Sequence, residues 1–264
     1  MLEQILLIIF IFLFGIIIGS FLNVCILRIP KHETIVTVPS HCMTCGYKLK
    51  WYDNIPLLSY IILRGKCRNC KAHISAQYPI IEAINGVAYV LISVWFLNIY
   101  DLAYVNYTNI LTAVIYCALF SALLVLTVID WRTYEIPLGI NIFIGVLGIG
   151  HIFLDLDNWL SYAIGAFAVS VPLLLILLIS KGRAIGGGDV KLMAAAGLLL
   201  GWQKIILAFV IGCIVGSIIH IIRMKASGEG KVLAMGLYLS VGIMTTVIAG
   251  DYIINRYLTL VGLA

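Results

Sequence analysis

Charged residues are scarce in this chain of 264 residues, since lysine, arginine, aspartate and glutamate together make up only 11%. A soluble protein of ordinary composition has about 25%. Proline is also rare, with 6 residues, and there is no low-complexity segment and no convincing internal repeat. Apolar residues are abundant instead, at 62%, and the mean hydropathy is +1.10. The composition excludes a soluble protein and indicates a polytopic membrane protein.

Several apolar runs reach the ~20 residues that a helix needs to cross a bilayer. We expect an all-α integral membrane protein with about eight transmembrane helices, at roughly 5–27, 80–98, 110–129, 139–154, 161–179, 190–203, 205–222 and 232–250. The fourth and sixth of these are short. The first run has no basic segment before it and exceeds the ~7–15 residues of a signal-peptide core, so we interpret it as a helix of the mature protein.

The basic residues are distributed unevenly around these expected spans. They concentrate in four polar segments, namely 28–79, 130–138, 180–191 and 223–231. Only Lys204 and Arg256 lie elsewhere, which leaves 15 of the 17 lysines and arginines in the four segments. With eight spans the four segments share one face, which the positive-inside rule assigns to the cytoplasm. The net charge of +5 therefore reflects membrane topology, and we expect membrane lipids rather than nucleic acid as a partner.

The polar region 28–79 contains two C-x-x-C pairs, formed by Cys42, Cys45, Cys67 and Cys70. Pairs of this kind typically place four thiolates around one tetrahedral zinc ion. A region of this size cannot build a large core, so metal binding would supply much of its folding free energy. The alternatives are two disulfides or free thiols, and the reducing cytoplasm disfavours the disulfides. Because four cysteines would fill the coordination shell, a structural role is favoured for the metal.

Two acidic residues adjoin apolar runs. Asp130 ends the run 119–129, and Asp189 follows three glycines at the start of another run. Consecutive glycines cost backbone entropy, which indicates a close approach of the backbone to another helix or to a substrate. On the expected topology both acids lie at cytoplasmic ends of spans, where two carboxylates facing one water molecule would form an aspartic protease site. The alternative is that each is an ordinary interfacial acid.

These motifs together resemble those of the type IV prepilin peptidases, also called prepilin leader peptidases and N-methyltransferases. The G-x-G-D element is shared with presenilin-like intramembrane aspartic proteases. The resemblance covers most of the chain and is carried by Gly19-Ser20-Phe21-Leu22-Asn23-Val24, the two C-x-x-C pairs, Trp51-Tyr52-Asp53-Asn54-Ile55-Pro56, Tyr78-Pro79 with Glu82, Asp130 with Ile136-Pro137, and Gly186-Gly187-Gly188-Asp189-Val190-Lys191-Leu192.

The resemblance implies an aspartic endopeptidase of the bacterial cytoplasmic (inner) membrane, with its active site on the cytoplasmic side. Such an enzyme cleaves the basic leader from prepilins of type IV pili or from pseudopilins of secretion systems, then methylates the new N-terminus with S-adenosylmethionine. Asp130 and Asp189 would be the catalytic acids, with Gly186, Gly187 and Gly188 as a substrate loop. The four cysteines would bind Zn²⁺, and Glu82 is a candidate for binding S-adenosylmethionine.

The implied organisation is a first transmembrane helix (1–27), a cytoplasmic zinc domain linked to methyl transfer (28–79) and a transmembrane peptidase core (80–264). One segment departs from the family pattern. Many members carry a Pro-Phe-Gly-Pro-like stretch before the last span, whereas residues 233–238 read Leu-Ala-Met-Gly-Leu-Tyr, so only Gly236 matches. Two alternatives stay open: a membrane scaffold or transporter with a zinc-knuckle cytoplasmic domain, and a peptidase that lacks methyltransferase activity.

Overall fold

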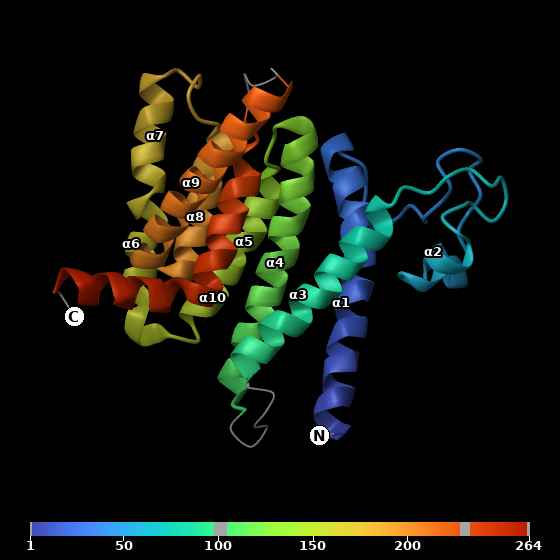
Figure 1. Cartoon of the computed structure of the whole chain (residues 1–264), viewed down its shortest axis with the longest axis horizontal. Helices are drawn as coiled ribbons and strands as arrows, with labels where there is room; N and C mark the ends of the chain where they lie inside the picture. The colour runs from blue at the N-terminus through green and yellow to red at the C-terminus, as the bar shows by residue number, and fades with distance from the viewer. Residues whose placement is uncertain (1, 98–104, 228–232, 263–264) are drawn as a thin grey trace. The chain divides into compact units, whose positions relative to one another are not determined.

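A computed structural model describes residues 2–97, 105–227 and 233–262, and within these ranges the chain forms helices and no β-strand (Figure 1). The helices are α1 (Leu2–Arg28), α2 (Leu58–Ile62), α3 (Gln77–Leu97), α4 (Tyr107–Thr133), α5 (Leu138–Ile152), α6 (Trp159–Ala168), α7 (Ser170–Ile179), α8 (Gly187–Leu200), α9 (Trp202–Ser227) and α10 (Met235–Val261). Short 3₁₀ helices are η1 (Ile29–Lys31), η2 (Trp51–Asn54) and η4 (Leu156–Asn158).

The expected all-helical membrane fold is confirmed. Six helical segments of the described chain are long and apolar enough to cross a membrane: Leu2–Lys31, Gln77–Leu97, Tyr107–Thr133, Leu156–Ile179, Trp202–Lys225 and Met235–Val261. The two remaining expected spans are also helices but are shorter, with 15 residues in α5 and 14 in α8. The expected span ends at 98 and 232, and the basic residue Lys231, lie outside the described residues. The protein is a multi-pass membrane protein.

The chain divides into two compact units, Met1–Ser121 and Ala122–Ala264, with the boundary inside α4. Unit 1 contains α1, α2, α3 and the four cysteines of the C-x-x-C pairs. Unit 2 contains α5 to α10 together with the C-terminal part of α4, and it holds both Asp130 and Asp189. The candidate metal centre and the candidate acid pair therefore belong to different units.

In unit 1, α1 packs closely against α3 through small and polar residues. A Cβ at Gly19 would lie 2.7 Å from the Cα of Glu82, so only glycine lets the helices approach this closely. The side-chain amide of Asn85 donates a hydrogen bond of 2.7 Å to the carbonyl oxygen of Gly15, and that of Asn23 donates one of 3.1 Å to Tyr78. Small residues with interhelical hydrogen bonds are a usual packing mode of membrane helices. This packing fixes where α3 presents Glu82.

In unit 2, α8 is the central helix, in contact with α5, α6, α7 and α9 (Figure 1). From Leu192 onward its side chains are apolar on all sides, and several are 0% exposed: Leu192, Met193, Ala196 and Leu199. A helix that is apolar all round is a buried helix. A Cβ at Gly197 would overlap the carbonyl oxygen of Gly165 in α6, so these two helices also touch through their backbones. The first turn of α8, which carries Asp189, is thereby held in a defined place within unit 2.

Candidate active site and metal centre

Asp130 lies in the last turns of α4 and points into the interior of unit 2. It is 4% exposed, and Leu126 and Ile129 on the same face are 0% and 1% exposed. The spacing of these three residues places them on one side of a helix. The backbone N–H of Gly236 donates a hydrogen bond of 2.9 Å to Oδ2 of Asp130. Asp130 is thus a buried acid with a backbone donor, which argues against an ordinary interfacial position.

Gly236 lies in the first turn of α10, whose N–H groups have no partner within the helix. The residue before the helix, Ala234, has no side chain that could accept a hydrogen bond from these N–H groups. The carboxylate of Asp130 in α4 accepts the hydrogen bond of one of them, the N–H of Gly236. The positive end of the α10 dipole therefore faces the carboxylate of Asp130 and stabilises negative charge on it. The hydrogen bond joins residues 106 positions apart in the sequence.

Asp189 lies in the first turn of α8, so it too is placed at the positive end of a helix dipole. The glycines before it permit close approaches and do not need left-handed backbone, since none of them has positive φ. A Cβ at Gly186 would lie 3.1 Å from Oδ2 of Asp189, and one at Gly188 would lie 2.8 Å from Cβ of Ile136. The close approach at Gly188 is to the side chain of Ile136, in the loop between α4 and α5, rather than to another helix.

Ile136 connects the surroundings of the two acids. It contacts the Gly188 position on one side, and its Cδ1 lies 3.1 Å from where a Cβ of Gly236 would be. Gly188 precedes Asp189, and Gly236 donates to Asp130. Both acids therefore adjoin the same side chain, that of Ile136. The structure thus brings both predicted acids into one site within unit 2, beside the N-termini of α8 and α10.

The sequence reasoning missed Asn141, which lies near the start of α5. Its Nδ2 is 3.4 Å from the carbonyl oxygen of Gly188, a long hydrogen bond, and the residue is 4% exposed. Its Oδ1 is buried and has no hydrogen-bond partner within the described chain. The signal was available, because a polar residue within a short apolar helix of a membrane protein usually faces protein rather than lipid.

The four cysteines of the two C-x-x-C pairs converge in unit 1. Their sulfur atoms all lie within 4.8 Å of one another, and the Sγ atoms of Cys42 and Cys70, which come from different pairs, are 3.8 Å apart. Four ligands at a Zn–S distance of about 2.3 Å in a tetrahedron are separated by about 3.8 Å. The thiols are free and unpaired by disulfides. The residues therefore fit a single zinc ion.

Each cysteine pair sits on a tight turn of the same design. The backbone N–H of Cys42 donates to the carbonyl of Tyr47, and that of Cys67 donates to Ala72. The positive φ that closes the turn falls on Gly46 in the first pair and on Lys71 in the second. Backbone N–H groups of Cys45 and Thr44 lower the pKa of the Cys42 thiol to about 6. A thiol prepared in this way is readily held as the thiolate that a metal needs.

An ion pair ties the segment between the cysteine pairs to the second turn. Arg68, within the second pair, donates a hydrogen bond of 2.7 Å to Oδ1 of Asp53, whose side chain is 0% exposed. The backbone N–H of Lys50 donates to the other carboxylate oxygen. The Arg68 guanidinium also lies over the ring of Tyr52, at 5.0 Å from its centroid. The Trp51–Pro56 motif is therefore a structural part of the metal domain.

Glu82 points inward from the first turns of α3 rather than toward the membrane surface. It is 6% exposed, and its Oε2 accepts a hydrogen bond of 2.8 Å from the backbone N–H of Leu57. Leu57 has a φ of 60°, an unusual conformation for a residue with a side chain. Such strain persists where surrounding contacts hold it and is common at functional sites. Glu82 thus fastens the segment between the two cysteine pairs to α3.

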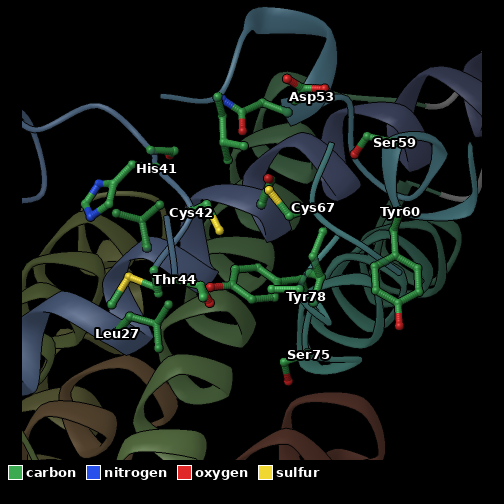
Figure 2. Close-up of a pocket in the computed structure, with 18 of the residues that line it drawn as sticks. Leu27, His41, Cys42, Thr44, Asp53, Ser59, Tyr60, Cys67, Ser75 and Tyr78 are labelled. Atoms are coloured by element: carbon green, nitrogen blue, oxygen red, sulfur yellow. The ribbon is translucent and has the colours of Figure 1, made fainter. Parts of the chain in front are cut away.

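A cavity of about 910 Å³ lies between the cysteine turns, the end of α1 and the start of α3, and Glu82 lines it. Figure 2 shows its lining, with Leu27 from α1, Cys42 and Cys67 from the turns, and Tyr78 from α3. The sequence did not predict this cavity, because its walls come from three segments far apart in the chain.

Comparisons with known proteins agree with the two-part layout. The Bacterial Peptidase A24 N-terminal domain matches residues 13–96, and the Type IV leader peptidase family matches residues 117–221. The chain is 30% identical over 250 residues to the Prepilin leader peptidase/N-methyltransferase of Bacillus subtilis, and the aligned region covers 94% of this chain and 96% of that protein. It is 29% identical over 280 residues to the protein of the same name from Pseudomonas aeruginosa, covering 95% and 93%.

A third protein of the same name, from Myxococcus xanthus, is 31% identical over 226 residues, which are 84% of this chain but only 64% of that longer relative. No solved structure matches the chain. Two family models match successive parts of the sequence, and relatives near 30% identity align along almost its full length. The chain belongs to the type IV leader peptidase family.

Proposed function

We propose that this protein is an aspartic endopeptidase that cleaves the basic leader of type IV prepilins or pseudopilins, and that it then methylates the new N-terminus. The observation that supports the peptidase activity is that buried Asp130 and half-buried Asp189 lie on either side of Ile136. The names of the relatives, prepilin leader peptidase/N-methyltransferase, support both activities and do not favour a non-enzymatic scaffold or transporter.

The chemistry of the site is that of two carboxylates sharing one proton. Two acids at close range cannot both ionise readily, so one acts as base toward a water molecule while the other donates a proton to the scissile carbonyl. The N-termini of α8 and α10 face the pair and stabilise the single negative charge that it keeps. Donation by Gly236 orients Asp130, and the loop 186–188 leaves room for an extended substrate backbone beside Asp189.

The location of the acids suits a substrate with a basic leader followed by an apolar helix. Asp130 lies near the end of α4, and Asp189 lies in the first turn of α8. Both therefore lie at the cytoplasmic ends of helices on the topology that the basic residues indicate. A prepilin whose apolar helix is in the bilayer would present its cleavage site at this level, in a bacterial inner membrane.

For the second activity we propose that Cys42, Cys45, Cys67 and Cys70 hold a structural Zn²⁺ that keeps the cytoplasmic domain folded. S-adenosylmethionine supplies the methyl group when bound. The four thiolates complete the coordination of the metal and leave no open position for substrate. The metal would therefore stabilise the fold of the domain and would not act as a Lewis acid in the reaction.

Cleavage of a prepilin by the purified full-length protein tests the proposal. We expect Asp130→Asn and Asp189→Asn each to lower the cleavage rate by about 10²–10⁴-fold, the usual contribution of general acid–base groups. Asp157→Asn is a matched control, because Asp157 is an exposed acid in η4. Retained cleavage in either catalytic variant would refute the peptidase assignment.

Mass spectrometry of the mature pilin N-terminus separates the full proposal from a peptidase without methyltransferase activity. A product heavier by one methyl group supports both activities. An unmodified N-terminus, produced in the presence of S-adenosylmethionine, would support the peptidase activity and contradict the methyltransferase activity.

A further inference from the structure

We propose that α2 inserts into the membrane surface through the side chains of Leu58, Ile61 and Ile62, which we call the α2 apolar face, and that it prefers anionic phospholipids. The segment between the two cysteine pairs would then be an interfacial membrane anchor. This inference goes beyond the proposed enzymatic activity and does not depend on it. Three observations support it: the exposure of the α2 apolar face, the depth at which α2 is held, and the charge of the residues around it.

The α2 apolar face is exposed although its three side chains are large and apolar. The exposed fractions are 50% for Leu58, 68% for Ile61 and 64% for Ile62. These positions are three and four residues apart, which places them on one side of the helix. Ser59 and Tyr60, between them in the sequence, line the cavity of unit 1 instead (Figure 2). α2 therefore turns one side toward its own domain and leaves an apolar side largely uncovered by the described residues.

A hydrogen bond sets the depth of α2 relative to the membrane. The N–H of Leu57, the residue before α2, donates to Oε2 of Glu82 at 2.8 Å. α3 has 21 residues and is about 31 Å long, close to the ~30 Å hydrocarbon core of a bilayer, and Glu82 lies only about 7.5 Å from its start. Ile80 and Ile84, on either side of Glu82, are 52% and 43% exposed, which suits residues that face lipid. α2 therefore begins at the level of the membrane interface.

The exposed charges around α2 are positive. Four exposed basic residues flank it in the sequence: Lys48, Lys50, Arg64 and Lys66. The only acid between residues 48 and 66 is Asp53, whose side chain is 0% exposed and paired with Arg68. Basic side chains beside an apolar face are typical of segments that lie in the membrane interface, where they attract anionic headgroups. A surface of anionic phospholipid therefore matches both the charge and the depth of α2.

An anchor at α2 would restrain the candidate metal centre. α2 lies between Cys45 and Cys67, so its insertion holds both cysteine turns close to the membrane surface. The cysteine turns would then meet chain segments that emerge from the bilayer in preference to segments free in solution.

Photo-cross-linking tests the inference in the purified full-length protein, reconstituted in nanodiscs of phosphatidylcholine and phosphatidylglycerol. An apolar diazirine amino acid replaces Ile61, and the adducts formed under ultraviolet light are identified by mass spectrometry. We expect phospholipid adducts at this position. The same probe at Ile84, exposed on α3, is the positive control, and Met43, an exposed apolar residue of the first cysteine turn, is the control for water adducts. Adducts of water alone at position 61 overturn the inference, and so do cross-links to protein alone, which would indicate a protein partner.

The preference for anionic lipid is measured by changing the nanodisc. Replacing phosphatidylglycerol by phosphatidylcholine should lower the yield of phospholipid adducts at position 61 several-fold, because the flanking basic residues lose their anionic partners. Equal yields in the two lipids overturn the preference for anionic phospholipid.

Hydrogen exchange gives an independent measurement without the probe. The double variant Ile61→Asp with Ile62→Asp should raise the exchange rate of the α2 amides in nanodiscs by about tenfold or more, because a helix this short depends on its surroundings for protection. Met43→Asp should leave these rates unchanged. An unchanged rate in the double variant overturns the inference. A rise that extends to the amides of Cys42 and Cys67 would indicate unfolding of the cysteine turns, and the cross-linking result then decides.

Discussion

The backbone N–H of Gly236 and the carboxylate of Asp130 form a hydrogen bond of 2.9 Å that connects α10 to α4. The contact makes Asp130 a cap for the first turn of α10, whose N–H groups would otherwise lack a partner. It also explains why one glycine matches the family pattern in a segment that otherwise departs from it. Gly236, the residue that matches the family pattern, hydrogen-bonds the predicted catalytic acid Asp130. The segment can therefore position this acid without the prolines that many family members carry.

Substitution Gly236→Ala should impair cleavage strongly. A Cβ there would lie 2.9 Å from both Oδ2 of Asp130 and Cδ2 of Leu126, so the carboxylate must move. A displacement of about 1 Å in a catalytic group can cost about 10²-fold in rate. We expect a fall of that order in kcat for a prepilin substrate. Gly139→Ala is the control, because nothing lies within 4 Å of a Cβ at Gly139. Equal activity of the two variants would contradict the positioning role.

The three glycines before Asp189 should differ in their tolerance of alanine. At Gly188 a Cβ would lie 2.8 Å from Cβ of Ile136, whereas at Gly187 the nearest atom is Cδ1 of Leu177, at 3.8 Å. We expect Gly188→Ala to lower the cleavage rate at least tenfold and Gly187→Ala to change it little. The double variant with Ile136→Ala should recover part of the loss, because the obstructing side chain is removed. A loss of activity in Gly187→Ala together with normal activity in Gly188→Ala would contradict this prediction.

Asn141 should act on the loop that carries Asp189 rather than on the chemistry directly. Its side chain reaches the carbonyl oxygen of Gly188 at 3.4 Å. We expect Asn141→Ala to lower kcat about threefold to tenfold, a loss of roughly 1 kcal/mol that matches one neutral hydrogen bond. The shape of the pH–rate profile should not change, because the acids themselves are intact. Asn106→Ala, at an exposed position before α4, serves as the control. A shifted pH profile would point to a direct catalytic role instead.

Metal removal should unfold the cysteine turns while leaving unit 2 intact. We expect one zinc per chain, and we expect Cys70→Ser to lose it, because three thiolates no longer complete the tetrahedron. Limited proteolysis should then cut within residues 32–75. Cys213→Ser is the control, since Cys213 in α9 is outside the cluster. A metal-free wild-type protein that resists proteolysis in this region would contradict the structural role.

Much of this protein is determined by local sequence. The length of the apolar runs specifies membrane helices, because no other element except a closed barrel satisfies its backbone in lipid. The two C-x-x-C pairs specify a metal-binding turn each, because the turn and its ligands are contained in a few residues. The glycines before Asp189 likewise signal a close backbone approach. These features could be predicted because each depends on neighbours in the chain.

The tertiary structure decided the rest. The hydrogen bond from Gly236 to Asp130 spans 106 positions, and that from Leu57 to Glu82 spans 25. The sequence left Asp130 and Asp189 with an ordinary interfacial alternative, and only the packing of the helices shows that Asp130 is buried. The negative charge of Asp130 is stabilised by the N-terminus of α10, whereas Asp130 itself belongs to α4. No local sequence pattern around Asp130 could therefore have predicted this stabilisation. Such contacts depend on which helix faces meet, and that is set by the fit of side chains over the whole fold.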